Sequence, residues 1–233
     1  MIILHHCVNA RSFRPLWTLE ELGLDYKLCM LPFPPRERRR DFLATNPLGT
    51  VPAFLDGETR MTESAAICQY LVTRHGPTPL NVEPDEPAYG AFLNWLHFGE
   101  ATLTFPQTIV LRYSRFEKPG RQLPQAVADY TRWFLARLRA VDATVLSADH
   151  LCADRFTAAD VSVGYALMLA EDLDLSERFS PAVACYWRRL KSREAFKRAT
   201  KRQQAAAIEQ GVPTISSARS ATEPASDIAE KPG

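Results

Sequence analysis

The chain has 233 residues, of which 46% are hydrophobic and 24% are charged, a composition that suits one globular unit or two small packed domains. The formal net charge is only +1, which disfavours nucleic acid as a partner, because nucleic-acid-binding domains usually carry a clear excess of Lys and Arg. No run approaches the roughly 20 apolar residues of a membrane-spanning helix, and no basic segment precedes an apolar run at the start, so we expect neither a membrane partner nor a secretory signal.

The first part of the chain alternates strand and helix patterns. A short buried strand at residues 2–4 leads through a loop at 5–11 into a helix, for which Ser12 is a candidate N-cap and Gly23 the stop. Next come a strand at 26–31, a basic proline-rich loop at 32–40, a helical turn at 41–44, strands at 51–55 and 60–62 around an Asp56-Gly57 turn, and a helix at 63–74. This order, βαβ followed by ββα, predicts a thioredoxin-like domain over residues 1–76.

The remainder of the chain is predicted to be helical. A proline-rich linker covers residues 77–87, and an all-helical domain covers 88–205. Its expected helices are 88–113 with a kink at Pro106, 123–146, 158–170, 182–190 and 194–204. Residues 206–233 are rich in small and polar residues, and we expect them to form a disordered tail.

The cysteines give a further indication of the cellular compartment. There are five, scattered along the chain without a Cys-x-x-Cys pair, which disfavours a disulfide framework and a metal or redox site of that kind (Cys7, Cys29, Cys68, Cys152 and Cys185). A reducing cytoplasm is the simplest interpretation, and we expect no metal cofactor.

Three blocks, in this order and spacing, resemble the cytosolic-type glutathione S-transferase family over about the first 200 residues. The first is Arg14-Pro-Leu-Trp-Thr-Leu-Glu-Glu-Leu-Gly23. The second is Asn46-Pro-Leu-Gly-Thr-Val-Pro-Ala-Phe-Leu55 with Thr62-Glu-Ser-Ala-Ala-Ile67. The third joins Phe156-Thr-Ala-Ala-Asp-Val-Ser162 to Tyr186-Trp-Arg-Arg-Leu190 and Ala195-Phe-Lys-Arg-Ala199.

The resemblance implies that glutathione is the co-substrate and that the second block holds it. A cis Val51-Pro52 bond would turn the Val51 backbone outward, where the cysteinyl part of glutathione can pair as an added strand. Ser64, at a helix N-terminus, would bind the γ-glutamyl carboxylate, and Glu63 would face the ammonium group. Thr157 and Asp160 have the form of a capping signal, to which we assign a structural role.

The group that activates the glutathione thiol is expected in the loop at residues 5–12. This loop has no tyrosine, and Ala10 stands where many relatives carry serine. We rank Asn9 first, because its side-chain N–H could donate to the thiolate, and Ser12 second, because it could equally be an N-cap. Cys7 and His6 are further alternatives, each more readily explained as a buried or packed residue.

Charged and aromatic residues complete the predicted site. Arg11 could bind a glutathione carboxylate. Thr50 stands where relatives often have a long polar side chain for the glycyl end, a contact that the arginines at 36–40 could replace. The hydrophobic acceptor would lie between the first loop and the start of the helical domain. Candidates to line that pocket are Trp95, Phe98, Phe105, Arg112 and Tyr113, of which we expect about half to be core residues.

The main functional hypothesis is a detoxifying glutathione transferase that joins the glutathione thiolate to a hydrophobic, aromatic electrophile. One alternative is a glutathione-dependent thiol-disulfide or peroxide reductase that uses Cys7. Another is a non-catalytic glutathione-binding scaffold, which Ala10 and Thr50 would suit. The resemblance also implies a homodimer, with the first domain of one subunit packed on residues 88–113 and the neighbouring helix of the other.

Overall fold

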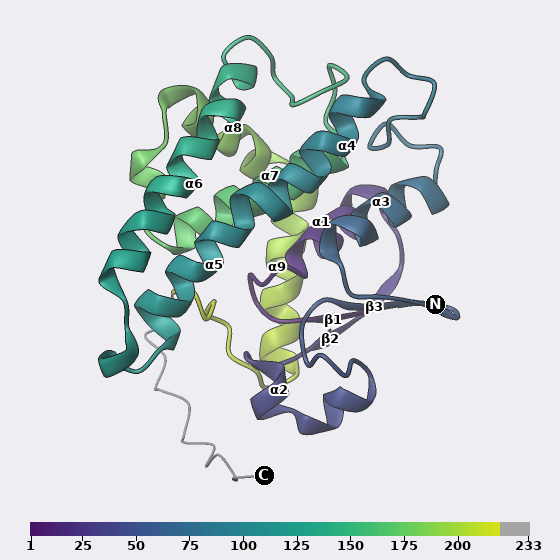
Figure 1. The fold of residues 1–233 in the computed structure, drawn as a ribbon. Coiled ribbons are helices and arrows are strands. Elements are labelled where there is room, and N and C mark those ends of the chain that lie inside the picture. Colours follow the sequence, from purple (N-terminus) through teal and green to yellow (C-terminus); the bar gives the residue numbers. More distant parts are fainter. Residues whose placement is uncertain (220–233) are drawn as a thin grey trace.

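The structure is a computed structural model that describes residues 1–219, and its N-terminal part is a four-stranded sheet flanked by helices (Figure 1). The thioredoxin-like arrangement predicted for the N-terminal domain is therefore confirmed. The elements in chain order are β1 (Ile2–His6), α1 (Phe13–Leu22), β2 (Tyr26–Met30), α2 (Pro35–Arg38), the 3-10 segment η1 (Arg40–Ala44), β3 (Ala53–Asp56), β4 (Thr59–Met61) and α3 (Ser64–Arg74). The loop expected at residues 32–40 thus contains the short helix α2.

The sheet has the strand order β2-β1-β3-β4, with β1 parallel to β2 and antiparallel to β3. Helices α1 and α3 cover one face and α2 lies on the other (Figure 1). The register places His5 of β1 beside Ala53 of β3. The loop after β1 and the segment before β3 are therefore neighbours at the same end of the two paired strands.

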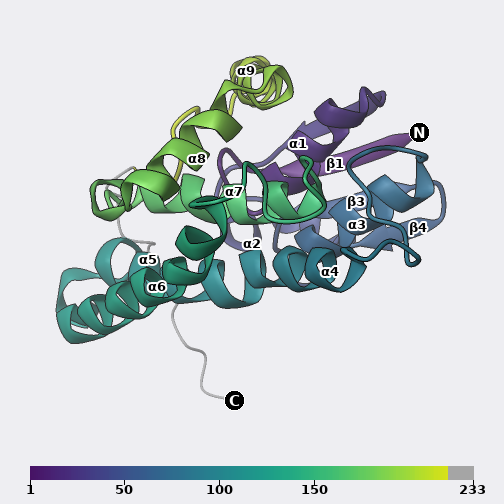
Figure 2. The ribbon, with the colours of Figure 1, turned by 90° about the horizontal axis from the view of Figure 1, so that it is seen from above.

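The rest of the described chain is helical, as predicted, and stands beside the sheet domain (Figure 2). The α-helices are α4 (Tyr89–His97), α5 (Phe105–Leu111), α6 (Pro124–Val145), α7 (Ala158–Asp172), α8 (Pro181–Ser192) and α9 (Glu194–Glu209); short segments are η2 (Phe98–Thr104), η3 (Arg112–Phe116), η4 (Pro119–Arg121) and η5 (Ser176–Arg178). Helix α7 is buried along nearly its whole length and forms the centre of this domain. Within residues 1–219, no helix is both long and apolar enough to cross a membrane.

The long helix expected at 88–113 changes its hydrogen-bond pattern along its length. The segment η2, with π-helical hydrogen bonding, separates α4 from α5 just before Phe105 and Pro106. Proline has no N–H to continue an α-helical ladder, and the wider π-helical hydrogen bonding lies immediately before it. Glu100 lies in this π-helical segment, and its carboxylate contacts Arg11 and Arg14 of the sheet domain.

The predicted capping signal before α7 is confirmed. The Asp160 carboxylate accepts from the Thr157 N–H at 2.8 Å, and the Thr157 hydroxyl caps the helix in return. Asp160 also accepts from the Leu151 N–H and from the Tyr186 hydroxyl, at 3.2 and 2.7 Å. All these partners belong to the helical domain, which agrees with a structural role.

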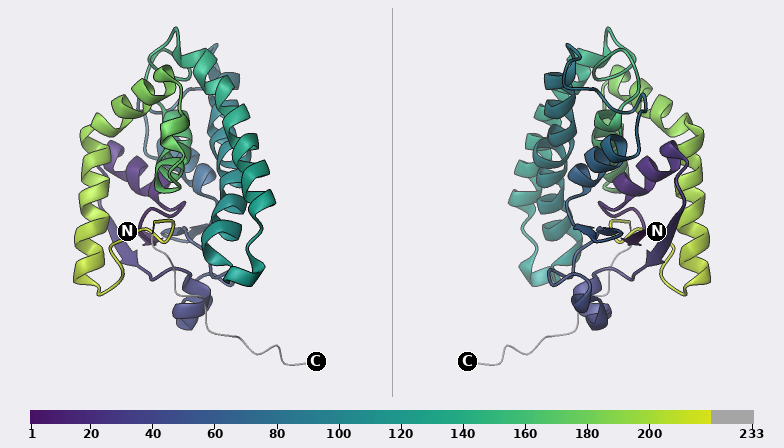
Figure 3. Two further views of the ribbon diagram at one scale, coloured as in Figure 1. Left: turned by 90° about the vertical axis from the view of Figure 1, so that its left-hand side faces the viewer. Right: turned by 90° about the vertical axis from the view of Figure 1, so that its right-hand side faces the viewer.

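The C-terminal part differs from the expected tail. Helix α9 runs to Glu209, beyond the boundary expected at residue 205, because Ala206 and Ala207 continue its buried face and alanine favours helix. Ser216 and Ala218 are also buried. This segment turns back from the end of α9 toward α5 and α7 (Figure 3). The remainder of the predicted tail, 220–233, lies outside the described residues.

Helix α9 also contacts the sheet. Its last turn places Gln210 beside the edge strand β2, where the side-chain Oε1 accepts from the Met30 N–H at 2.8 Å and Nε2 donates to the Leu28 carbonyl at 2.9 Å. The side-chain amide therefore hydrogen-bonds to the strand as a neighbouring backbone would.

Candidate functional site

The centre of the site is a buried arginine that joins the two domains. Arg14 of α1 is fully buried, and its guanidinium donates to the Ser64 hydroxyl at 3.1 Å and to the Glu100 carboxylate. The remaining donors reach the helical domain, at the Ser162 and Gly99 carbonyls and the Thr104 hydroxyl. The Tyr165 ring lies 4.3 Å below the guanidinium. A buried charge with this set of partners holds α1, α3 and η2 in one arrangement.

Arg11 belongs to the same network. Its Nε donates to Glu100 at 2.6 Å, so this carboxylate lies between two guanidinium groups. Burial disfavours the charge of Glu100, but Arg14 and Arg11 outweigh burial and lower the pKa of the carboxyl group. Burial likewise disfavours the charge of Arg11, yet the Glu100 carboxylate raises its pKa. Both groups are therefore ionised at neutral pH, and the network of Arg11, Arg14 and Glu100 carries a net positive charge.

The segment at residues 46–52 is shaped by its own hydrogen bonds. The Asn46 side chain accepts from the Leu48 N–H and donates to the Thr50 carbonyl, at 3.1 and 2.8 Å. Gly49 has a φ of 60°, and a Cβ there would stand 2.5 Å from Cβ of Arg36, so only glycine suits this turn. Thr50 is exposed. The asparagine and the glycine of the motif therefore set the path of the chain into Val51.

The predicted cis peptide between Val51 and Pro52 is confirmed. Within residues 1–219, neither the N–H nor the C=O of Val51 has a hydrogen-bond partner, although strand β3 begins two residues later. Val51 packs against a small buried cluster that contains Cys7 and Ala53, and Ala10 packs against the same cluster. An open backbone pair thus lies directly beside the loop after β1, available to an extended ligand.

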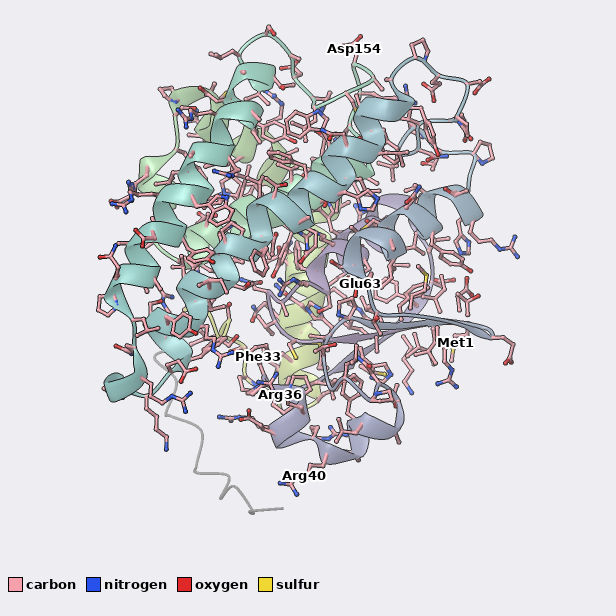
Figure 4. The ribbon with its side chains drawn as sticks, viewed as in Figure 1. Met1, Phe33, Arg36, Arg40, Glu63 and Asp154 are labelled. Atoms are coloured by element: carbon pink, nitrogen blue, oxygen red, sulfur yellow. The ribbon has the colours of Figure 1, made fainter. Side chains whose placement is uncertain are left out.

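The start of α3 presents an exposed acid and a buried hydroxyl. Glu63 is the N-cap residue and is exposed, near the centre of the molecule above Phe33 and Arg36 (Figure 4). Because the Ser64 oxygen accepts from Arg14, its own proton is available to a further acceptor. The first backbone N–H groups of α3 are also unused within the helix, so this end favours an anion.

Asn9 is held in a fixed orientation. It has a left-handed φ of 53°, which asparagine tolerates well. The side-chain oxygen accepts from Gln203 Nε2 at 2.7 Å, and Nδ2 donates to the Asp172 carboxylate at 2.9 Å. The Tyr165 hydroxyl donates to the Asn9 carbonyl at 3.3 Å. These bonds identify which side-chain atom is nitrogen, and they leave the second N–H of that nitrogen to other acceptors.

Ser12 is fully buried and bonds a histidine. It precedes α1 but makes no cap hydrogen bond, and its hydroxyl lies 2.7 Å from Nδ1 of His6. The other ring nitrogen of His6 lies 2.8 Å from the Gln203 side-chain oxygen, which can only accept, so Nε2 carries the proton and Ser12 donates to Nδ1. Burial lowers the pKa of His6 to about 4, and the ring is neutral at pH 7. The Ser12 proton is thus already used.

Cys7 is buried, with 1% of its surface exposed. Burial raises the pKa of its thiol well above the ordinary value, so the thiolate is scarce at neutral pH. The side chain packs with Leu31, Phe42 and Ala53. This environment matches the interpretation of Cys7 as a small core residue.

Two of the five residues predicted for the acceptor pocket face elsewhere. The rings of Trp95 and Phe98 lie 5.1 Å apart, and Phe98 lines a shallow depression on the outer side of α4 and η2 with Leu93, Ala101 and neighbouring residues. Glu100, two positions after Phe98, points to the opposite side of the helix, toward Arg11. The structure therefore groups Phe98 with the outer surface of the helical domain.

The other three lie along the α5 and η3 segment, with Phe105 at the start of α5 and Arg112 and Tyr113 directly after its end. Phe105 is half-exposed, and the Arg112 guanidinium lies over the Tyr113 ring while pairing with Glu117. The same segment brings Phe116 against Phe33 of the loop after β2, with ring centroids 5.3 Å apart. This pair, which the sequence did not predict, forms an aromatic contact between the two domains.

Other residues of the site were also missed by sequence reasoning. Arg14 and Glu100 could have been noticed as charged residues within otherwise apolar helical patterns, since such residues are rarely buried unless paired. Tyr165, Asp172 and Gln203 lie more than 150 positions from Asn9. No local pattern connects them with that loop.

Comparisons with known proteins agree with this arrangement. The N-terminal domain of glutathione S-transferases matches residues 4–79. Glutathione S-transferase 4 of Zea mays is 31% identical over 189 residues, which cover 78% of this chain and 83% of the maize protein. Glutathione S-transferase 3 of Schizosaccharomyces pombe is 27% identical over 188 residues, covering 76% of this chain and 78% of the yeast protein.

Solved structures share the fold. A glutathione transferase from Methylococcus capsulatus has a TM-score of 0.78 at 24% identity, covering 89% of this chain and all of that one. Ure2p in complex with glutathione has a TM-score of 0.76 at 22% identity, covering 85% of this chain and 97% of that one. Together with the maize relative, the matched N-terminal domain identifies this chain as a member of the glutathione S-transferase family.

Proposed function

We propose that the protein is a glutathione transferase that binds glutathione across Val51 and the start of α3. The observation that carries the proposal is the open Val51 backbone, in a residue that packs against the same cluster as Ala10 of the first loop. The cysteinyl part of glutathione would pair with that backbone. Its γ-glutamyl carboxylate would accept from the Ser64 hydroxyl and the N–H groups of α3, and its ammonium group would face Glu63.

Asn9 is the residue we assign to thiol activation. Its free side-chain N–H would donate to the sulfur and favour the thiolate over the thiol. The positive charge that remains on the Arg11, Arg14 and Glu100 network acts in the same direction. The thiolate then attacks the electrophilic carbon, forming the carbon–sulfur bond as the leaving group departs with its electron pair. Ser12 has no role in this step, because its proton already goes to His6.

The acceptor would bind beside the α5 and η3 segment. Phe105, Tyr113 and the Phe33–Phe116 pair offer aromatic surface, and Arg112 offers a positive charge for a departing anion. A hydrophobic, aromatic electrophile suits these groups. Reduction through Cys7 has no such support, since that thiol is buried and its pKa is raised.

We further propose a cytoplasmic homodimer. Shallow depressions lie over α3 and β4, lined by Met61, Tyr70 and neighbouring residues, and over α4 and η2, lined by Leu93 and Phe98. Helices α3 and α4 are both at the front in Figure 1. A two-fold contact would place the first domain of each subunit on α4 of the other, and Phe98 would be buried there. Scattering or sedimentation at micromolar concentration should give twice the 26.2 kDa chain mass.

The test of the proposed function combines binding with thiolate formation. The protein should be retained on immobilised glutathione and released by free glutathione. The ultraviolet absorbance of bound glutathione should show thiolate at pH 7, where free glutathione is mostly thiol. Turnover of 1-chloro-2,4-dinitrobenzene should follow. Retention without thiolate would favour the scaffold alternative, and no retention at all would contradict both.

A further inference from the structure

The end of the described chain reaches the Asn9 loop through one carboxylate. Asp172, the last residue of α7, has 1% of its side chain exposed. One of its oxygens accepts from Asn9 Nδ2 at 2.9 Å, and the other accepts from Nε of Arg219 at 2.5 Å. Asp172 therefore joins the residue assigned to thiol activation to a residue near the C-terminus.

The segment that carries Arg219 is packed against the protein. The Thr214 carbonyl accepts from the Gln204 side chain at 3.0 Å, and Ser216 closes a turn by accepting from the Arg219 N–H at 2.9 Å. Ala218 is 3% exposed and lies among Val110 and Leu111 of α5 and Leu169 of α7. The packed turn thus holds Arg219 against Asp172, although about half of the Arg219 side chain is exposed.

The charge of Asp172 makes this contact consequential. A carboxylate one hydrogen bond from Asn9 opposes formation of a thiolate on the other side of that amide. Two uncharged groups lie around Asn9 and Asp172, namely the neutral His6 ring and the Tyr165 hydroxyl. Two guanidinium groups bond Asp172 itself: Arg115 donates to its carbonyl and Arg219 to its carboxylate. The Arg11–Glu100 pair lies nearby. Within residues 1–219, the ion pair described for the Asp172 carboxylate is the one with Arg219.

We propose that Asp172 and Arg219 are positioning residues for Asn9, and that the C-terminal turn at 214–219 is therefore part of the thiol-activating site. This inference rests on the proposed function. Asp172 orients the Asn9 amide so that its second N–H faces the sulfur. Arg219 neutralises Asp172, so that the orienting group does not repel the thiolate.

The experiment compares Arg219→Gln, Arg219→Lys and Asp172→Asn, with Arg132→Gln as the matched control, because Arg132 forms an exposed ion pair with Asp129 on α6. The readout is the thiol pKa of bound glutathione, from the pH dependence of thiolate absorbance. Arg219→Gln should raise it by about half a unit, which is a roughly threefold fall in the thiolate-to-thiol ratio, while Arg219→Lys and the control stay near the wild type.

A double-mutant cycle makes the coupling explicit. In the Asp172→Asn background, Arg219→Gln should have no further effect on the thiol pKa. An equal effect in both backgrounds, or none in the wild type, would overturn the inference.

A second readout is independent of glutathione. In the ligand-free protein, Arg219→Gln should shift the Asn9 side-chain amide resonances, and the control should not. Unchanged resonances would overturn the inference, even if the wild type forms thiolate. If the wild type forms no thiolate, the proposed function fails, whereas shifted resonances would still support the positioning of Asn9.

Discussion

The Ser12 hydroxyl and the His6 ring lie 2.7 Å apart, and both side chains are fully buried. The second ring nitrogen binds Gln203, which in turn binds Asn9. Ser12 is therefore the remote end of a chain of hydrogen bonds that terminates at Asn9. The two residues considered for catalysis have different roles, one supporting and one facing the ligand.

Asn9→Gly is expected to lower kcat by about 100-fold, because it removes one donor from the sulfur. Glycine is chosen because it accepts the left-handed φ of this position, where alanine would add backbone strain. Ser12→Ala should instead lower the free energy of unfolding by about 1–2 kcal/mol and leave the thiol pKa of bound glutathione unchanged. Steady-state kinetics and denaturant unfolding on both variants separate these outcomes, and the reverse pattern would restore Ser12 as the donor.

Thr50→Lys should tighten glutathione binding by up to about fivefold. Thr50 is exposed beside Val51, and an exposed ion pair with the glycyl carboxylate is worth at most about 1 kcal/mol. Isothermal titration with glutathione measures the change. Ala140→Lys places the same charge on the exposed side of α6 and should not alter the affinity. Equal gains in both variants would indicate a general charge effect.

Arg14→Met should destabilise the fold by about 3–5 kcal/mol, because the Glu100 carboxylate and the Gly99 and Ser162 carbonyls each lose one hydrogen-bond donor. Denaturant unfolding gives this value, and Arg139→Met on the exposed face of α6 is the matched control. A loss below about 1 kcal/mol would show that the network contributes little to stability.

The stability of the protein should fall between pH 6.5 and about 4 through His6. The folded ring has a pKa of about 4, below the ordinary 6.5, so the unfolded chain binds the proton first as the pH is lowered. This contributes a loss of about 3 kcal/mol across that window and nothing further below it. Denaturant unfolding at several pH values should show a shallower dependence in His6→Gln. Parallel curves for the two proteins would contradict this prediction.

Local patterns predicted the features that depend on nearby residues. The capping box joins Thr157 and Asp160, which are three positions apart. The hydrogen bonds that shape the segment leading to Val51 and Pro52 join residues at most four positions apart. The capping box was predicted from its own residues and is confirmed, whereas the cis Val51-Pro52 bond, also confirmed, was predicted from the family resemblance. The Gly23 stop also depends on its own left-handed φ of 63°.

Features that depend on distant residues were not predictable in this way. An N-cap at Ser12 was a reasonable expectation, but the hydroxyl bonds a ring that Gln203 holds from 197 positions away. The aromatic stripe on α4 could not show which side faces the sheet domain, because that side is set by contacts such as Glu100 with Arg11, which lies 89 positions away. The tail lacks aromatic residues, yet the small side chain of Ala218 fills a gap between helices.

The contact of Gln210 with β2 has a consequence for the order in which the protein is completed. Strand β2 is an edge of the sheet, and an unpaired edge can recruit a strand from another chain. Synthesis proceeds from the N-terminus, so the sheet can assemble well before residue 210 is added. Until then, the Met30 N–H and the Leu28 carbonyl lack the partner that they have in the finished fold. Nascent chains stopped before α9 should therefore associate through this strand more readily than the full-length protein.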